Sequence, residues 1–403
     1  MTAIDLDQSA TTSVRRPVLE AMWPHLTGEY GNPSSAHSLG RRAKDALEDA
    51  RARVAAVAGV RPAQVVFTSG GTEADNLAVI GLTLGGIATG RGRHIIVGAI
   101  EHEAVLAAAK YLERWHGVRV DRLPVDNSGV LDVSALDALL GSDTALVSAQ
   151  HANNEVGTLQ PLAELGILAR TSGARLHVDA VQTAGWLPLD PARSPELSTA
   201  RPDAIAISGH KLGAPKGVGA LILPTSAPIE PVIHGGGQER DRRSGTENVA
   251  GAVGLATALE LAEADRAADL AAAAPDADPA SAASTTTARR NRFIARVRAA
   301  VPEARLTGHP ERRLPGHASF VVEGIGGEPL LIGLDDRGVV CSSGSACAAG
   351  RDEPSPVLLA MGYEPDLART ALRFSFGPAT TDAELDAAVR ALAEAAADLR
   401  ALG

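Results

Sequence analysis

A lysine that follows a short apolar run is the first residue of the chain that could do covalent chemistry. The run AIAI at 204–207 predicts a buried strand, and Lys211 lies just beyond it in SGHKLGAPKG at 208–217. Open α/β sheets bind ligands at the carboxyl ends of their strands, where a partly desolvated amine becomes a nucleophile for carbonyl groups. A surface loop lysine is the alternative, and this stretch alone does not decide between the two.

A glycine-rich turn earlier in the chain has the arrangement of an anion site. The apolar residues 65–67 predict a strand, which runs into TSGGTEADN at 68–76 and then into an apolar helix. Backbone N–H groups at such a helix start point toward an anion, and Thr72 beside Gly71 adds a hydroxyl donor. The turn matches neither the P-loop nor the dinucleotide fingerprint, so nucleotide binding is not favoured. A tight turn with a capping threonine remains the alternative.

Polar residues also follow the ends of other predicted strands. They are Glu101 and His102 after 94–100, HANNE at 151–155 after 145–149, and Asp179 with Gln182 after 175–178. Any one of them could be a capping or turn residue. Their recurrence at corresponding ends of one sheet predicts a single crevice that they share.

The two cysteines lie in different surroundings. Cys341 directly follows the apolar Val339 and Val340, which predicts a buried and inert thiol. Cys347 lies among serine, alanine and glycine in SSGSACAAG, where it is a candidate nucleophile if its pKa is lowered. Further on, Arg373 lies in an apolar predicted strand, where a charge is costly unless it meets an anion.

Strands and helices alternate over the first two thirds of the chain, which predicts an α/β fold with a mainly parallel sheet covered by helices on both faces. A second unit follows, with a helix to 301, a strand at 318–322, a helix near 330–334 and a final helix at 382–402. We therefore expect a large domain of residues 14–255 and a small α+β domain of residues 1–13 with 256–403. The stretch 271–288 is rich in Pro, Asp, Ser and Thr, and predicts an exposed connection.

Composition and charge narrow the class of protein. The 403 residues include 48 acidic and 38 basic ones, a net charge of −10, which argues against nucleic acid as the main ligand. The start of the chain lacks the pattern of a signal peptide, and no run of residues is long and apolar enough to span a bilayer. Two cysteines are too few for a disulfide scaffold or a four-thiolate metal site. These features predict a cytoplasmic enzyme without a metal.

With these residues in view, the sequence resembles the cysteine desulfurases, which are pyridoxal-phosphate enzymes of fold type I in the class V aminotransferase group. The resemblance covers nearly the whole chain, and the spacing from SSGSAC to EPS at 353–355 is similar to that of the subgroup with the longer catalytic loop. The motifs that carry it are GNPSSAH at 31–37, TSGGTEADN at 68–76, EH at 101–102, HANNEVG at 151–157, HVDAVQ at 177–182, SGHKLGAPKG at 208–217, RRSGTEN at 242–248 and SSGSAC at 342–347.

The resemblance implies a role for each candidate residue. Lys211 would hold pyridoxal 5'-phosphate as a Schiff base, Asp179 would pair with the ring nitrogen, and Gln182 would bond the ring hydroxyl. His102 would stack on the ring and assist proton transfer. The remaining roles are phosphate binding by Gly71, Thr72, Ser208 and His210, phosphate binding in the other subunit by Thr246, and binding of the substrate carboxylate by Asn154 and Arg373.

The implied reaction takes sulfur from L-cysteine, leaves it as a persulfide on Cys347 and releases L-alanine. The resemblance also implies a homodimer with shared sites, and an iron–sulfur scaffold or another protein as sulfur acceptor. A selenocysteine lyase or an aminotransferase of the same fold is the alternative. Cys347 discriminates against transamination, because that reaction needs no enzyme thiol.

Overall fold

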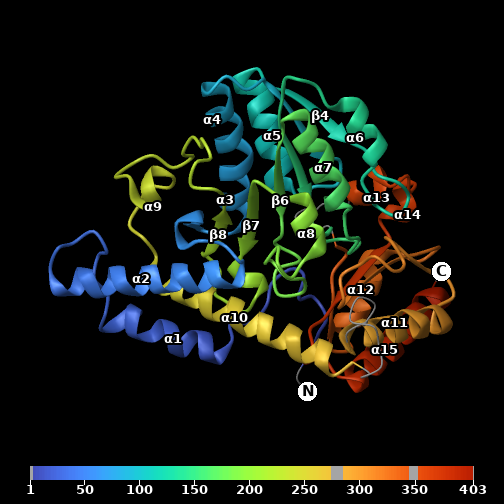
Figure 1. The fold of residues 1–403 in the computed structure, drawn as a ribbon. Helices are drawn as coiled ribbons and strands as arrows, with labels where there is room; N and C mark the ends of the chain where they lie inside the picture. The colour runs from blue at the N-terminus through green and yellow to red at the C-terminus, as the bar shows by residue number, and fades with distance from the viewer. Residues whose placement is uncertain (1–2, 274–284, 345–352, 403) are drawn as a thin grey trace.

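The computed structural model describes residues 3–273, 285–344 and 353–402. Its centre is a seven-stranded sheet with the order β2-β8-β7-β6-β5-β3-β4, shown in Figure 1. All neighbouring strands are parallel except β8, which runs antiparallel to both β2 and β7. The predicted mainly parallel sheet is therefore confirmed. Its strands are β2 (Val65–Thr68), β3 (His94–Gly98), β4 (Arg119–Leu123), β5 (Thr144–Gln150), β6 (Arg175–Asp179), β7 (Ala204–Ser208) and β8 (Gly219–Ile222).

Helices bury both faces of this sheet, as a parallel sheet requires. Side chains of alternate strand residues enter two different hydrophobic clusters, one shared with α1, α2, α7, α8 and α10 and the other with α3, α5 and the turn between α3 and α4. The helices of this unit are α1 (Arg16–Thr27), α2 (Ser38–Val57), α3 (Gly71–Asn76), α4 (Leu82–Ala88), α5 (Glu103–His116), α6 (Val133–Leu139), α7 (Leu162–Ser172), α8 (Pro195–Ala200), α9 (Gln238–Asp241) and α10 (Val249–Ala271).

A smaller unit with its own hydrophobic cluster follows in the chain, at the lower right of Figure 1. Its antiparallel sheet has the order β12-β10-β9 and packs against α11, α12 and α15. The N-terminal strand β1 (Ile4–Asp5) pairs with β11 (Val339–Val340), so the start of the chain joins the smaller unit. The other elements are α11 (Thr285–Ala300), β9 (Ala304–Leu306), β10 (His317–Val322), α12 (Gly327–Asp335), α13 (Pro356–Ala360), α14 (Pro365–Ala368), β12 (Ala371–Ser375) and α15 (Asp382–Leu402).

The connection expected over 271–288 is partly helical. Residues 274–284 lie outside the described part of the chain, but α11 already begins at Thr285. Thr286 is fully buried, and its backbone N–H donates to Asp269 Oδ1 at 3.1 Å. The Asp269 carboxylate of α10 thus accepts from the first two residues of α11 and holds the start of this helix against the preceding one. The domain division at residues 13 and 255 stays a prediction, since α10 spans the second boundary.

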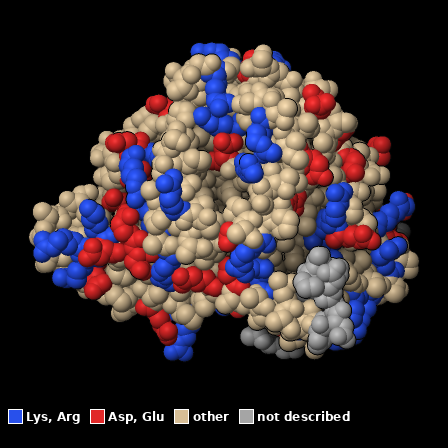
Figure 2. Space-filling view, in the orientation of Figure 1, with Lys and Arg blue, Asp and Glu red and all other residues tan. Residues whose placement is uncertain are grey.

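The surface charge and the character of the helices bear on the expected class of protein. Lys and Arg side chains lie interspersed with Asp and Glu over the face shown in Figure 2. Among the described residues, no helix combines the length and the apolar character needed to cross a membrane.

Candidate active site

A cavity of about 960 Å³ opens at the carboxyl ends of the central strands. Gln150, Asp179 and Ser208, the last residues of β5, β6 and β7, all line it. The sequence-predicted residues that line this cavity are Gly71, Thr72, His102, Asn154, Asp179, Gln182, Ser208, His210, Lys211 and Arg373. Residues more than 300 positions apart thus face one space, which is the crevice that an open α/β sheet uses for its ligands.

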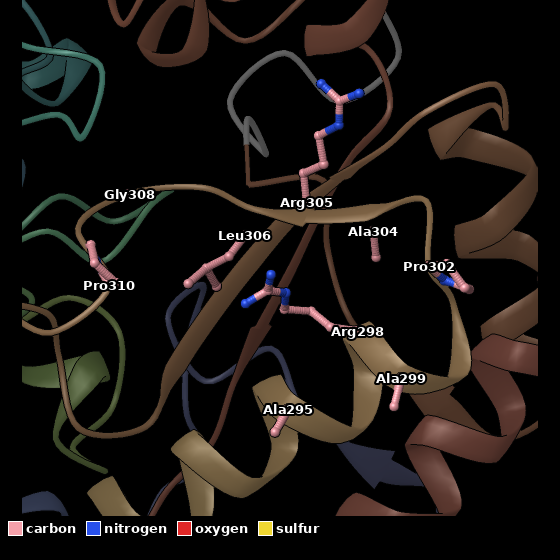
Figure 3. Close-up of a pocket in the computed structure, with 9 residues that line it drawn as sticks. All are labelled: Ala295, Arg298, Ala299, Pro302, Ala304, Arg305, Leu306, Gly308 and Pro310. Carbon is pink, nitrogen blue, oxygen red and sulfur yellow. The ribbon is translucent and has the colours of Figure 1, made fainter.

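A second cavity, of about 780 Å³, lies on the smaller unit between α11 and β9 (Figure 3). Among the described residues, its charged lining residues are Arg298 and Arg305, and Arg305 points away from Arg298 and is ion-paired with Glu323. Within the described part of the chain, its lining has no cysteine, serine or threonine, no carboxylate and no histidine. The cavity in the large unit is therefore the candidate active site.

The backbone around Lys211 is held by close packing. The 3₁₀ turn Gly209–Lys211 directly follows β7, and a Cβ at position 209 would come within 2.9 Å of Val218 Cγ1. The Lys211 Nζ donates to the carbonyl oxygen of Ala10 at 2.7 Å and to that of Ser9. The amine is thus directed toward the N-terminal segment, which also pairs with the smaller unit.

Asp179, the last residue of β6, lines the same cavity as Lys211 and is 7% exposed. Its Oδ1 accepts the backbone N–H of Val181 at 2.8 Å. Burial raises the pKa of Asp179, while the Val181 N–H and the nearby charges of His102 and Lys211 act in the opposite direction. A buried carboxyl in this state gains from a cationic partner in the cavity.

His102 is the N-cap residue of α5, and its Nδ1 accepts the backbone N–H of Ala104 at 3.1 Å. In a neutral imidazole this contact places the ring proton on Nε2. The helix start therefore fixes both the position and the tautomer of this side chain.

The glycine-rich turn at the start of α3 approaches β7 closely. A Cβ at Gly71 would lie 2.7 Å from Val181 Cγ2 and 3.2 Å from Ser208 Cβ, so only glycine fits. Beside it, His210 Nδ1 lies 3.1 Å from Thr11 Oγ1. Burial, together with the charges of Lys211 and Lys216, lowers the pKa of His210 to about 4, so its imidazole is neutral.

Arg373 enters the cavity from β12 of the smaller unit. Its Nη2 is ion-paired with Asp7 Oδ1 at 2.6 Å, and its Nη1 donates to the carbonyl oxygen of Asn154 at 3.0 Å. The anion that this buried charge needs is thus supplied within the chain by Asp7. Arg373 Nε is buried without a hydrogen-bond partner among the described residues.

The other predicted residues have different surroundings. Gln182 Nε2 donates to Ser9 O at 3.1 Å, whereas Thr246 is exposed and does not line the cavity. Cys347 lies outside the described residues. Cys341 packs against the core of the smaller unit, the place that its sequence predicts, and burial raises the pKa of its thiol to about 12.

Sequence reasoning missed three contributors to the site. The carbonyl groups of Ser9 and Ala10 contact Lys211, but backbone acceptors have no sequence signal. Asp75, the third, is 2% exposed and lines the cavity beside Glu101, which the strand-end pattern did place there. Both lie within the motifs noted above, and their burial could have been suspected only from the apolar residues that surround them.

Comparison with known proteins places this fold and site in a family. The sequence profile of the family described as aminotransferase class-V matches residues 4–388, and the chain belongs to this family. Relatives at about 40% identity are named cysteine desulfurases. One from Dictyoglomus turgidum is 40% identical and aligns over 94% of this chain and 91% of its own length. An IscS-like cysteine desulfurase from Mycobacterium tuberculosis is 40% identical, over 98% of this chain and 96% of its own.

Solved structures give the same result. A NifS-like protein superposes with a TM-score of 0.86 at 35% identity, covering 99% of this chain and all of its own. DndA from Streptomyces lividans, at 37% identity, gives a TM-score of 0.73 over 92% of this chain and 99% of its own. A structure of SspA in complex with cysteine superposes with a TM-score of 0.76 at 30% identity, covering 93% of this chain and 99% of its own.

Proposed function

We propose that this chain is a cysteine desulfurase, which converts L-cysteine to L-alanine and transfers the sulfur to its own Cys347. The observation that carries the proposal is the meeting of Lys211, Asp179, His102 and Arg373 in one cavity at the sheet edge. The names of the relatives support the substrate, since they describe the same chemistry at about 40% identity over nearly the full length.

Pyridoxal 5'-phosphate is the cofactor that fits these residues. Its aldehyde would meet the Lys211 amine, its ring nitrogen Asp179, and its ring hydroxyl Gln182. Gly71, Thr72, Ser208 and the neutral His210, which line the cavity together, would receive the phosphate. When bound, this cofactor withdraws electrons from the substrate's α-carbon.

The chain's own residues then hold the substrate and move its protons. His102, with Nδ1 engaged by Ala104, offers Nε2 for proton transfer near the cofactor. Asn154 and Arg373, which line the same cavity, would hold the substrate carboxylate. Cys347, as a thiolate, would attack the sulfur of the substrate and form a sulfur–sulfur bond. The substrate's carbon–sulfur bond would break with its electron pair left on the carbon, which takes up a proton in the alanine product, and the sulfur would remain on Cys347 as a persulfide.

The assembly is also part of the proposal. Thr246 is exposed and lies outside this chain's own cavity, which supports a role in the site of a second copy in a homodimer. We propose further that the enzyme is cytoplasmic and that an iron–sulfur scaffold or another sulfur-acceptor protein takes the persulfide. The large domain of residues 14–255 would carry the cofactor, and the small domain of residues 1–13 with 256–403 would carry Cys347.

Turnover of L-cysteine by the chain loaded with pyridoxal phosphate tests the function. We expect alanine and sulfide in equal amounts when a thiol reductant is present. Alanine without sulfide from cysteine, or a keto acid in place of alanine, would contradict the proposal and favour an aminotransferase. Release of selenium from selenocysteine without sulfide from cysteine would favour a selenocysteine lyase.

The two thiols provide matched variants for the sulfur-transfer step. Cys347→Ala should retain the absorbance of the bound cofactor but form no persulfide and release no sulfide. Cys341→Ala should remain active, since the thiol of Cys341 packs in the core with its pKa raised by burial. Peptide mass spectrometry after incubation with cysteine decides between them, and added sulfur on Cys341 alone would reverse the assignment.

A further inference from the structure

A row of polar side chains lies beneath the candidate cofactor site on one face of β5 and β6. The register pairs Ser148 with His177 and Gln150 with Asp179. Because side chains alternate along a strand, His177 and Asp179 point to the same face of the sheet. Ser148 Oγ lies 2.9 Å from His177 Nδ1. One nitrogen of His177 is therefore engaged directly beside the residue proposed to face the cofactor ring.

Asp75 reaches the other nitrogen of His177 from α3. Its Oδ1 lies 3.5 Å from His177 Nε2, and the two side chains are 2% and 0% exposed. Neither atom has a hydrogen-bond partner among the described residues. A donor or acceptor left unpaired in the interior is costly, and these two unpaired atoms face each other at 3.5 Å. One proton shared between Asp75 Oδ1 and His177 Nε2 would give both atoms a hydrogen bond.

Burial and the neighbouring carboxyls decide which of the two side chains carries this proton. Burial lowers the pKa of His177 to about 3, so its ring is neutral. Burial also raises the pKa of Asp75 well above its ordinary value, and the carboxyls of Asp179 and Glu101 raise it further. The proton therefore belongs to Asp75, which donates to His177 Nε2. The neutral ring then donates from Nδ1 to Ser148 Oγ.

Glu101 is the third carboxyl that faces this space. Its Oε1 accepts the backbone N–H of Gln150 at 2.9 Å, and its Oε2 is buried without a partner among the described residues. Burial raises its pKa well above the ordinary value, and Asp179 adds to the rise. Among the described residues, Lys211 and His102 lower the pKa of Asp179, and neither acts on Asp75 or Glu101. Three adjacent buried carboxyls cannot all be ionised, and Asp179 is the one that these basic groups favour.

We propose that Asp75 is a positioning residue, a neutral carboxylic acid that donates to His177 and so leaves Asp179 as the carboxylate that faces the cofactor. This rests on the proposed function for the identity of the cofactor, but the protonation of Asp75 is a property of the chain itself. An ionised Asp75 would raise the proton affinity of Asp179 and neutralise the partner of the ring nitrogen. As a neutral acid, Asp75 donates a hydrogen bond to His177 and adds no negative charge near Asp179.

Infrared spectroscopy of the full chain labelled with ¹³C-carboxyl aspartate tests the protonation state. We expect a carbonyl band of a protonated aspartic acid at neutral pH, both without cofactor and after addition of pyridoxal phosphate. The band should disappear in Asp75→Asn and remain in the matched control Asp137→Asn, which changes an exposed aspartate. Absence of the band from the unsubstituted chain, or its persistence in Asp75→Asn, would overturn the proposal.

Cofactor affinity separates the effect of the proton donor from that of charge. Asp75→Asn keeps a neutral donor toward His177, so the Kd for pyridoxal phosphate should stay within about twofold of its original value. Asp75→Leu leaves His177 Nε2 without a donor, and we expect about tenfold weaker binding. Equal losses in both variants would show that a negative charge on Asp75 is what matters, and would refute the proposal.

Folding and function have separate readouts. The melting temperature of each cofactor-free variant shows whether it folds. If Asp75→Leu does not fold, the infrared band and the cofactor affinity of Asp75→Asn still test whether Asp75 is a neutral donor. A chain that shows the band but releases no alanine from cysteine would contradict the proposed function and leave the assignment of Asp75 intact.

Discussion

The buried ion pair between Arg51 of α2 and Glu239 of α9 holds a loop in an unusual conformation. Arg51 Nη1 and Nη2 lie 2.6 and 2.8 Å from the two carboxylate oxygens of Glu239, and the Phe67 N–H donates to one of them at 3.1 Å. Glu239, Arg240 and Asp241 have φ angles of 50°, 59° and 62°, each of which costs about 1–3 kcal/mol for a residue other than glycine. The buried carboxylate is the contact that offsets this strain.

Glu239→Gln should lower the free energy of unfolding by about 3 kcal/mol. The two side chains are 2% and 3% exposed, and removing one partner of such a pair costs about 3–5 kcal/mol. We place the expected value at the lower end because Arg51 Nε also contacts Glu48 at 3.1 Å. Urea unfolding of the cofactor-free chain, followed by circular dichroism, measures the change.

The matched control is Arg240→Gln in the same loop. Arg240 contacts Glu48 at 3.3 Å with both side chains more than 40% exposed, so its loss should cost at most about 0.5 kcal/mol. The combined variant Arg51→Met with Glu239→Leu should be more stable than Glu239→Gln, because it leaves no buried charge unpaired. A loss below about 1 kcal/mol in Glu239→Gln would refute the reasoning.

Three further predictions concern the site. Lys211→Ala should abolish turnover and the borohydride-reducible link to pyridoxal phosphate, measured by mass spectrometry; a link that remains would point to another lysine, Lys216 being close in sequence. Asp179→Asn should slow alanine release about a hundredfold or more, since the ring nitrogen loses its charge partner, and an unchanged rate would contradict that role. Cys341 makes stability depend on pH: its pKa of about 12 in the folded chain exceeds the ordinary value of 9.0, so the unfolded thiol loses its proton first as pH rises above 9. Relative to Cys341→Ala, the unsubstituted chain should therefore lose about 1.4 kcal/mol between pH 8 and pH 10, and equal urea midpoint shifts for the two would contradict this.

Many elements of both units were predictable because their sequence signals are local. The run at 204–207 is apolar throughout, as a strand buried on both faces must be, and it forms β7. The final helix at 382–402 also has the bounds that the sequence predicts. The start of α11 was not predictable from composition, because Thr285 and Thr286 are held by Asp269, a contact that depends on how α10 and α11 meet.

By itself, the sequence determined which residue types are available and at which strand ends they lie, since both follow from short apolar runs and the turns after them. Lys211, Asp179 and His102 were found in this way. Only the tertiary structure decided what these residues contact. The carbonyl groups of the N-terminal segment at Lys211, and Asp7 at Arg373, come from residues roughly 200 and 366 positions away in sequence. Contacts over such separations are set by the packing of two units against one another, and a local pattern carries no record of them.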